Sequence, residues 1–482
     1  MVFSTPFFLF FYLPIVLAVY YITPLKFRNA VLLLVNLIFY GWGEPIYILI
    51  MFASIAIDYT HGLLVTRAKS KGNDRAARMA VASSVIFNLA LLFFFKYWNF
   101  IAGSLAGIGL GFMPIIERLP LPWGGSIPFT LPIGISFYTF QTMSYTIDVY
   151  RGDARAQKNI VTFGTFVTLF PQLIAGPIIK YKDLDDQLEH RTHSPEQFAS
   201  GVQTFVVGLA KKVLIANNIG SLWDAIKATE LGSLTVVGAW LGAITCMLQL
   251  YFDFSGYSDM AIGLGRMLGF EFMKNFDYPM ISKSISEFWR RWHISLGSWF
   301  REYVYFPLGG SRRGMGRTCL NLLIVWSLTG IWHGASWNFV LWGLYFGVFI
   351  LCERLFLGKL LDKLPGWAQH VYTLFLVTVS FAIFGVEDMA VLPGYLAAMF
   401  GFAGGGAVNA TTLYYLRNYL PVLLIAFVAA TPLMTGLAKK HLGLGKSQAG
   451  KVLLPVGLLA GLVLCTAYLV DATYNPFLYF RF

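Results

Sequence analysis

The sequence predicts an all-α polytopic membrane protein with about ten to twelve transmembrane helices. Three observations predict this class. Hydrophobic residues make up 57% of the 482-residue chain, whereas charged residues make up only 12%. Mean hydropathy is +0.64. Long uncharged stretches recur along the whole chain, whereas a membrane β-barrel has short alternating segments. We therefore expect residues 1–482 to form a single integral-membrane domain.

Topology explains the net charge of +12 better than nucleic-acid binding does. Most Lys and Arg residues lie in short loops between apolar runs, and such basic loops mark the cytoplasmic side of a membrane. This places the N-terminus outside. The opening residues lack a basic region and a cleavage site, which predicts a retained first span. The four cysteines have no metal-ligand spacing, so we expect no metal site.

Apolar runs in the first half of the chain alternate with charged loops. The expected spans there are residues 7–22, 30–42, 46–64 and 79–102. Pro and Gly interrupt two further segments, residues 129–138 and 170–177. The second is too short for a span, which favours a re-entrant element. Lys211 and Lys212 lie within the apolar run 205–219, so this run is expected in the interface or beside a polar cavity.

The second half begins with a full span, residues 234–254. It leads into a polar sequence that contains Asp253 and Asp259, where structural and catalytic roles are equally open. No internal repeat is visible, which argues against an inverted-repeat transporter. The later expected spans are residues 337–352, 371–386, 419–437 and 452–470.

A histidine lies near each end of the stretch from residue 287 to residue 337. We expect residues 286–303 to form one amphipathic helix at the inner interface. Such a helix would place four residues on a shared face: Trp289, His293, Leu296 and Phe300.

Basic residues outnumber acidic residues seven to two between positions 282 and 317. Two pairs stand out: Arg290 with Arg291, and Arg312 with Arg313. One interpretation is anchoring to lipid headgroups. The other is a cradle for a phosphorylated cofactor, because guanidinium groups match phosphate oxygens. The sequence favours neither.

Residues 320–352 carry no formally charged side chain. A single helix of this length would measure roughly 50 Å, well beyond the roughly 30 Å hydrocarbon core. We therefore expect a break near Gly330 and Gly334, beside His333. A neutral imidazole in an apolar site can accept a proton from a hydroxyl, which is the general-base role in acyl transfer. Ionisable residues inside a membrane usually have a function, so we favour this role for His333 over a purely structural hydrogen bond.

Four motifs resemble the membrane-bound O-acyltransferase family, most closely its bacterial alginate-type branch. They occur in the family's order, and the resemblance covers nearly the whole chain. The motifs are Phe170-Pro171-Gln172-Leu173-Ile174-Ala175-Gly176-Pro177, Tyr251-Phe252-Asp253-Phe254-Ser255-Gly256-Tyr257-Ser258-Asp259, Phe288-Trp289-Arg290-Arg291-Trp292-His293-Ile294-Ser295-Leu296 and Gly330-Ile331-Trp332-His333-Gly334.

The resemblance implies a ring of tilted helices, with re-entrant and interfacial helices, around a central tunnel in the bacterial inner membrane. It also implies acetyl-CoA as the donor, a polysaccharide acceptor outside, and periplasmic acetyltransferase-like partner proteins. His333 matches the family's essential histidine, and His293 matches its second polar position. On this hypothesis His333 is the general base, and His293 orients groups or polarises near the thioester carbonyl. Arg290, Arg291, Arg312 and Arg313 would then hold the CoA phosphates.

Other functions stay open. A transporter or channel for an acyl donor or a glycan would also explain broken helices and intramembrane histidines. A membrane scaffold for periplasmic transferases would tolerate substitution of both histidines. Transfer of D-alanyl groups, or of acyl groups to peptidoglycan, would use the same chemistry on another acceptor. The sequence does not name the polysaccharide.

Overall fold

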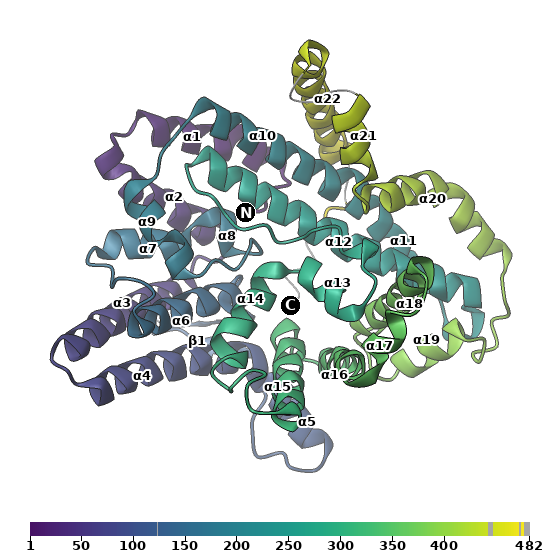
Figure 1. The fold of residues 1–482 in the computed structure, drawn as a ribbon, viewed down its shortest axis with the longest axis horizontal. Coiled ribbons are helices and arrows are strands. Elements are labelled where there is room, and N and C mark those ends of the chain that lie inside the picture. Colours follow the sequence, from purple (N-terminus) through teal and green to yellow (C-terminus); the bar gives the residue numbers. More distant parts are fainter. Residues whose placement is uncertain (123, 442–446, 472–473, 477–482) are drawn as a thin grey trace. The chain divides into compact units, whose positions relative to one another are not determined.

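A computed structural model of the protein describes residues 1–122, 124–441, 447–471 and 474–476. It is almost entirely helical, which confirms the predicted all-α class (Figure 1). The chain forms two compact units. Unit 1 comprises Met1–Phe3, Phe7–Gly201 and Leu264–Phe272, and unit 2 comprises Ser4–Pro6, Val202–Gly263 and Met273–Phe482.

Unit 1 contains the N-terminal helices and one small sheet. The strands β1 (Arg118–Pro120) and β2 (Ser126–Pro128) are antiparallel, with Leu119 opposite Ile127. The helices are α1 (Leu13–Ile22), α2 (Arg28–Gly43), α3 (Ile48–Ser70), α4 (Asp74–Leu92), α5 (Trp98–Gly107), α6 (Ile135–Arg151), α7 (Ile160–Thr168), α8 (Phe170–Leu173), α9 (Tyr181–His190) and the start of α10 (Pro195–Ala210).

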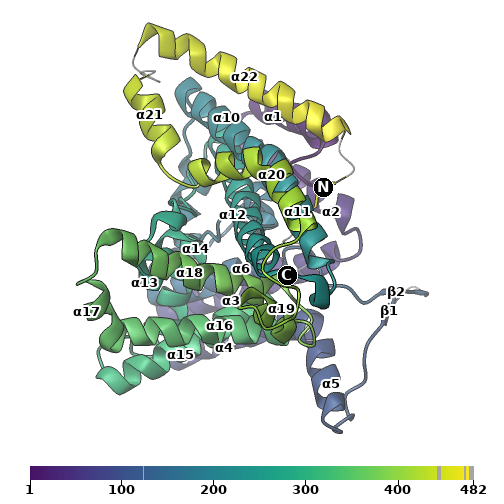
Figure 2. The same ribbon diagram turned by 90° about the vertical axis from the view of Figure 1, so that its right-hand side faces the viewer.

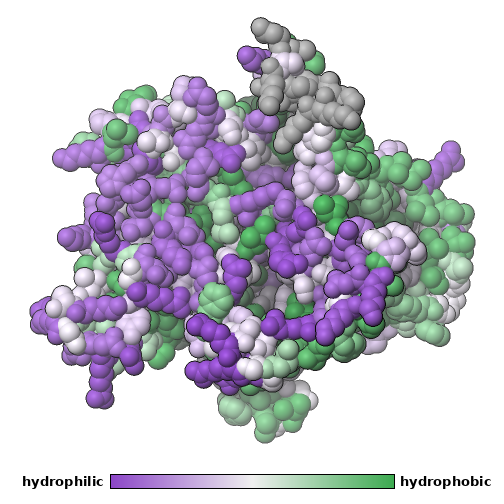
Figure 3. All heavy atoms as spheres, viewed as in Figure 1, coloured by the Kyte–Doolittle hydropathy of each residue, from purple (hydrophilic) through white to green (hydrophobic). Residues whose placement is uncertain are grey.

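Both expected interruptions in unit 1 are present. The helix α6 begins only after Gly134, whose φ of 75° favours glycine and whose Cα lies against the Leu173 carbonyl. The helix α8 has just four residues, and every residue from 170 to 180 is buried. The helices α3, α4 and α6 pack against one another. Hydrophilic side chains gather over α9 and the α3–α4 turn (Figure 3), as expected for loops facing water.

Unit 2 contains the end of α10, most of α12 and all later helices. A π-helical segment (Lys211–Ala216) joins α10 to α11. The helices are α11 (Asn217–Lys227), α12 (Val236–Met267), α13 (Ile285–Arg291), α14 (Ile294–Phe300), α15 (Met315–His333), α16 (Trp337–Cys352), α17 (Gly358–Leu361), α18 (Gly366–Gly385), α19 (Leu392–Met399), α20 (Ala410–Ala429), α21 (Leu433–His441) and α22 (Gln448–Asp471).

The uncharged run 320–352 folds into a helical hairpin. The helices α15 and α16 lie side by side, and α18 packs against α16 (Figure 2). Gly330 and Gly343 face each other, and a Cβ atom at either position would overlap the backbone of the opposite helix. The predicted break is confirmed, because α15 ends at His333 and α16 begins at Trp337.

Eight helices among the described residues are long and apolar enough to cross a membrane, so the chain is a multi-pass membrane protein. The expected ten to twelve spans include shorter or more polar helices. Examples are Phe8–Ile22 and α2, each with fewer than 18 residues. These elements explain the difference between the two counts.

Candidate functional site

His333 is the last residue of α15 and is buried, with 3% of its surface exposed. Its Nδ1–H donates to the Thr329 carbonyl oxygen at 2.7 Å. In the neutral ring this leaves the lone pair on Nε2. The ring packs edge-on against Trp342, with centroids 4.8 Å apart, and against Trp332 at 5.0 Å. The imidazole is therefore held in one orientation, with Nε2 as its basic atom.

His293 does not lie on a continuous helix, so the prediction for residues 286–303 is wrong. The chain leaves α13 at Trp292 in extended conformation, turns at His293 and re-enters helix at Ile294. His293 adopts φ 46° and ψ 53°, a left-handed conformation that costs a non-glycine residue roughly 1–3 kcal/mol. The side chain is 1% exposed, so it lies inside the unit and not on an interfacial face.

Asn275 explains the turn at His293. Its backbone carbonyl accepts from Ile294 N–H at 2.9 Å. Its side-chain oxygen accepts from His293 Nδ1 at 3.2 Å, Ser295 N–H at 3.1 Å and Ser295 Oγ at 2.9 Å. Its amide donates to Ser258 Oγ at 3.0 Å, which ties the turn to α12. These bonds offset the backbone strain and keep the proton of a neutral His293 on Nδ1.

The structure brings the two histidines together around Trp332. The Trp332 ring centroid lies 6.0 Å from that of His293 and 5.0 Å from that of His333. His293 lies outside the candidate membrane spans. Burial lowers the pKa of its imidazole well below the usual value, and the charge of nearby His333 lowers it further. His293 Nε2 is buried and has no hydrogen-bond partner among the described residues. The site therefore contains a neutral imidazole with an unused acceptor atom.

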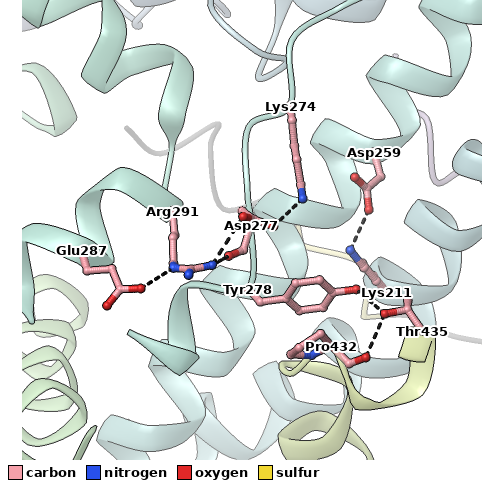
Figure 4. Close-up of polar contacts among 9 residues, drawn as sticks. All are labelled: Lys211, Asp259, Lys274, Asp277, Tyr278, Glu287, Arg291, Pro432 and Thr435. Carbon is pink, nitrogen blue, oxygen red and sulfur yellow. Dashed lines mark hydrogen bonds and ion pairs between the residues drawn. The ribbon is translucent and has the colours of Figure 1, made fainter. Parts of the chain in front are cut away.

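The four predicted arginines lie at two places in unit 2. Arg290 and Arg291 end α13, whereas Arg312 and Arg313 lie in the turn before α15. Arg291 donates to Glu287 at 2.9 Å and contacts the Asp277 carboxylate at 3.4 Å (Figure 4). The other three arginines are exposed. Arg354, which the sequence reading missed, joins the second group by donating to Ser311 Oγ at 3.2 Å.

Two ion pairs join the polar residues of α12 to the segment after α10. Lys212 pairs with Asp253 at 2.6 Å, and both side chains are almost fully buried. Lys211 pairs with Asp259 at 2.6 Å, with each side chain about one quarter exposed. All four residues stand out in the sequence, but the sequence does not show how they pair. The only available signal was charge of opposite sign within two apolar runs.

Two buried imidazoles, one of them with an unused acceptor atom, thus lie inside a helical membrane body. The model of the MBOAT, membrane-bound O-acyltransferase family matches residues 151–383, which include both histidines and all four arginines. The chain belongs to this family and is a membrane-bound O-acyltransferase.

Similar proteins are described as O-acetylases or O-acetyltransferases. A protein of Azotobacter vinelandii described as "probable alginate O-acetylase" is 42% identical over 89% of this chain and 84% of its own length. One of Pseudomonas putida with the same description is 40% identical over the whole of both chains. A peptidoglycan O-acetyltransferase of Helicobacter pylori is 31% identical over 84% of this chain and 80% of its own length.

Proposed function

We propose that the protein passes an acetyl group from cytoplasmic acetyl-CoA across the bacterial inner membrane for O-acetylation of an extracytoplasmic, alginate-like polysaccharide. Periplasmic acetyltransferase-like proteins are the proposed partners that deliver the group to the polymer. The observation that carries the proposal is the pair His293 and His333, buried around one tryptophan with both Nδ1 atoms used as donors. The descriptions of the relatives support acetyl as the group and alginate as the polymer type.

The proposed chemistry is a direct transfer with His333 as general base. Its Nε2 accepts the proton of the acceptor hydroxyl while the hydroxyl oxygen attacks the thioester carbonyl. The carbon–sulfur bond then breaks, and the departing CoA thiolate takes the proton from His333. The hydrogen bond from Nδ1 to Thr329 supports this role, because it fixes the ring and leaves Nε2 unprotonated.

We assign His293 the role of orienting a reactant, by accepting a hydrogen bond from a group other than the hydroxyl that His333 deprotonates. Polarising the thioester carbonyl would require a proton on Nε2, and the Nδ1 bond to Asn275 favours the opposite tautomer. A lone pair on Nε2 can accept from an N–H group of the acyl donor or from a second hydroxyl of the acceptor. The burial of this atom without a partner among the described residues supports a site that awaits a donor.

Substitution of Asn275 tests the tautomer assigned to His293. In Asn275→Asp the new carboxylate favours protonated His293, so its pKa rises. The charged ring then lacks an acceptor atom, so we expect activity to fall about tenfold near neutral pH and to recover as pH increases through the raised pKa. The measurement is the pH profile of kcat with acetyl-CoA.

The matched control is Asn321→Asp. Asn321 is another buried asparagine of unit 2, and its amide donates to the carbonyls of Leu308 and Gly310. This variant is expected to lose stability and keep the wild-type pH profile. The same profile in Asn275→Asp as in the wild-type protein would contradict the assigned tautomer.

The exposed pair Arg312 and Arg313 is proposed to bind CoA phosphates together with Arg290. Arg291 contributes less, because two carboxylates already engage it. Replacing both Arg312 and Arg313 by Ala is expected to raise the KM for acetyl-CoA roughly 10- to 100-fold with kcat unchanged. This factor corresponds to a loss of about 1.4–2.8 kcal/mol for the two contacts together, because solvent screens charged hydrogen bonds at exposed arginines.

Acetyl-pantetheine, which lacks the phosphates, is the control substrate for this variant. Its KM is expected to be the same in the variant and the wild-type protein. Arg75→Ala, at an exposed position of α4, controls for loss of charge alone. An unchanged KM for acetyl-CoA in the double variant would favour lipid anchoring.

Purified protein tests the function against a transporter. The enzyme is expected to cleave the thioester of acetyl-CoA and release free CoA when an acceptor is supplied, whereas a transporter would move the intact donor. A candidate acceptor mixture should contain alginate oligomers and peptidoglycan fragments, because relatives of both descriptions are similar to this chain. Acetylation of peptidoglycan alone would favour that polymer as the acceptor.

A further inference from the structure

Unit 2 contains a cavity of about 800 Å³ whose lining includes neither histidine. Its walls come from five segments: the join between α10 and α11, the helix α12, the loop after α12, the second half of α20 with the start of α21, and the second half of α22. Most of the lining is apolar, including Val207, Leu214, Ile215, Val422, Ile425 and Leu464. The cavity is far larger than a two-carbon acetyl group requires, and none of the four arginines considered for the CoA phosphates lines it.

Two of the walls face outward. The helices α20 and α22 are candidate spans in which only 17% and 11% of the most apolar window is buried. Side chains of α20 such as Leu420, Leu424 and Phe427 are exposed, as expected for a helix in contact with lipid. An apolar cavity between such helices is accessible to the acyl chains of the bilayer.

Charged side chains lie at one part of the cavity. Lys211 and Asp259 both line it and form an ion pair. Lys274 also lines it and pairs with Asp277, while the Tyr278 hydroxyl contacts Thr435 Oγ1 at 3.2 Å (Figure 4). Two cations thus stand beside two anions. Arg291 also contacts Asp277 but is itself paired with Glu287, so the formal charges of the whole group cancel.

We propose that this cavity binds one zwitterionic phospholipid with an ammonium headgroup, phosphatidylethanolamine. Its acyl chains would lie against the apolar walls. Its phosphate would contact the ammonium groups of Lys211 and Lys274, and its own ammonium would contact the carboxylates of Asp259 and Asp277. The balanced charges favour this lipid over an anionic one, because an anionic headgroup would meet two carboxylates without supplying a cation.

The lipid would also reach the surroundings of His293. Phe276 lines the cavity, and its ring stacks on the His293 ring with centroids 6.5 Å apart and planes 20° from parallel. A bound acyl chain would therefore restrict Phe276 and seal this side of the histidine site against other lipids. This effect is independent of which acyl group the enzyme transfers.

Native mass spectrometry of the full-length protein tests the proposal. The protein is purified in mild detergent and incubated with equal amounts of phosphatidylethanolamine and phosphatidylglycerol. The blocking variant is Ala429→Trp, which fills the cavity from α20. The control is Val428→Trp, at an exposed neighbouring position that does not line the cavity. Ile425→Trp serves as a second blocking variant if Ala429→Trp fails to fold.

We expect wild-type protein and Val428→Trp to retain one phosphatidylethanolamine per chain. The blocking variant is expected to retain about tenfold less, because the indole ring clashes with the lipid. The double variant Lys211→Met with Asp259→Leu is expected to lose the preference between the two lipids, since one ion pair is gone.

Three results would overturn the proposal: no retained lipid in wild-type protein, equal retention in the blocking variant, or a preference for phosphatidylglycerol. Loss of acetyl-CoA binding in the blocking variant, with lipid retention unchanged, would instead identify the cavity as a passage for the donor. The readout is lipid mass, so failure here is distinguishable from failure of the proposed acetyl transfer.

Discussion

His333→Ala is expected to reduce polysaccharide acetylation by about 10²- to 10⁴-fold, the usual contribution of a general base. Alanine removes the proton acceptor that Thr329 orients at the end of α15. The ring also fills space beside Trp332 and Trp342, so part of the loss could come from packing. His333→Gln separates the two effects, because it keeps polar volume without a basic nitrogen, and we expect it to be equally inactive.

The measurement is the acetyl content of the polysaccharide from intact cells. It is divided by the amount of wild-type or variant protein found in the membrane. His190→Ala is the matched histidine control, since His190 lies on α9 with 71% of its side chain exposed. It should retain full acetylation. Normal acetylation by His333→Ala at normal expression would contradict the assignment of the general base and favour a scaffold.

Asp253→Ala is expected to destabilise the protein by about 3–5 kcal/mol, because it leaves the Lys212 ammonium buried without its counter-ion. Lys212 is 3% exposed and Asp253 is 2% exposed, so water cannot replace the lost partner. The Lys212 ammonium also donates to the Pro476 carbonyl, and Asn475 contacts Asn217 and Ser4. Loss of the pair is therefore expected to loosen the chain end as well.

Replacing both partners distinguishes charge from packing. The double variant Lys212→Met with Asp253→Leu is expected to recover most of the lost stability, since apolar residues of similar size avoid the desolvation of two ions. Thermal unfolding in detergent measures both variants. The pair Lys211 and Asp259, whose side chains are each about one quarter exposed, provides the control, and its double alanine variant should change stability by only about 0.2–1 kcal/mol. A loss of similar size at both pairs would contradict this reasoning.

The features that depend on composition and local sequence were predictable. The run 320–352 is too long and too uncharged for one helix, so the break at Gly334 follows from the thickness of a bilayer. The interruptions before α6 and at α8 follow from nearby Pro and Gly residues. His333 was a candidate from its surroundings alone.

The geometry of His293 was not predictable, because it depends on a residue distant in sequence. Residues 286–303 have a good helical pattern. Hydrogen bonds of Asn275, together with the bond from Asp277 N–H to the Arg291 carbonyl, divide it. Arg291 looked free for phosphate in the sequence, but it pairs with Asp277, which lies in the same loop as Asn275. The pairing of Lys212 with Asp253 likewise requires knowledge of how two helices pack. The family resemblance identified these motifs without giving their contacts.

Sealed vesicles test the central claim, transfer of an acetyl group by His333, most directly. Purified wild-type protein or His333→Ala is reconstituted with acetyl-labelled acetyl-CoA inside and a hydroxyl acceptor outside, together with any periplasmic partner required. We expect labelled acetyl on the outer acceptor and free CoA inside with wild-type protein, and neither product with His333→Ala. Equal transfer by the variant, or intact acetyl-CoA outside the vesicles, would contradict the claim.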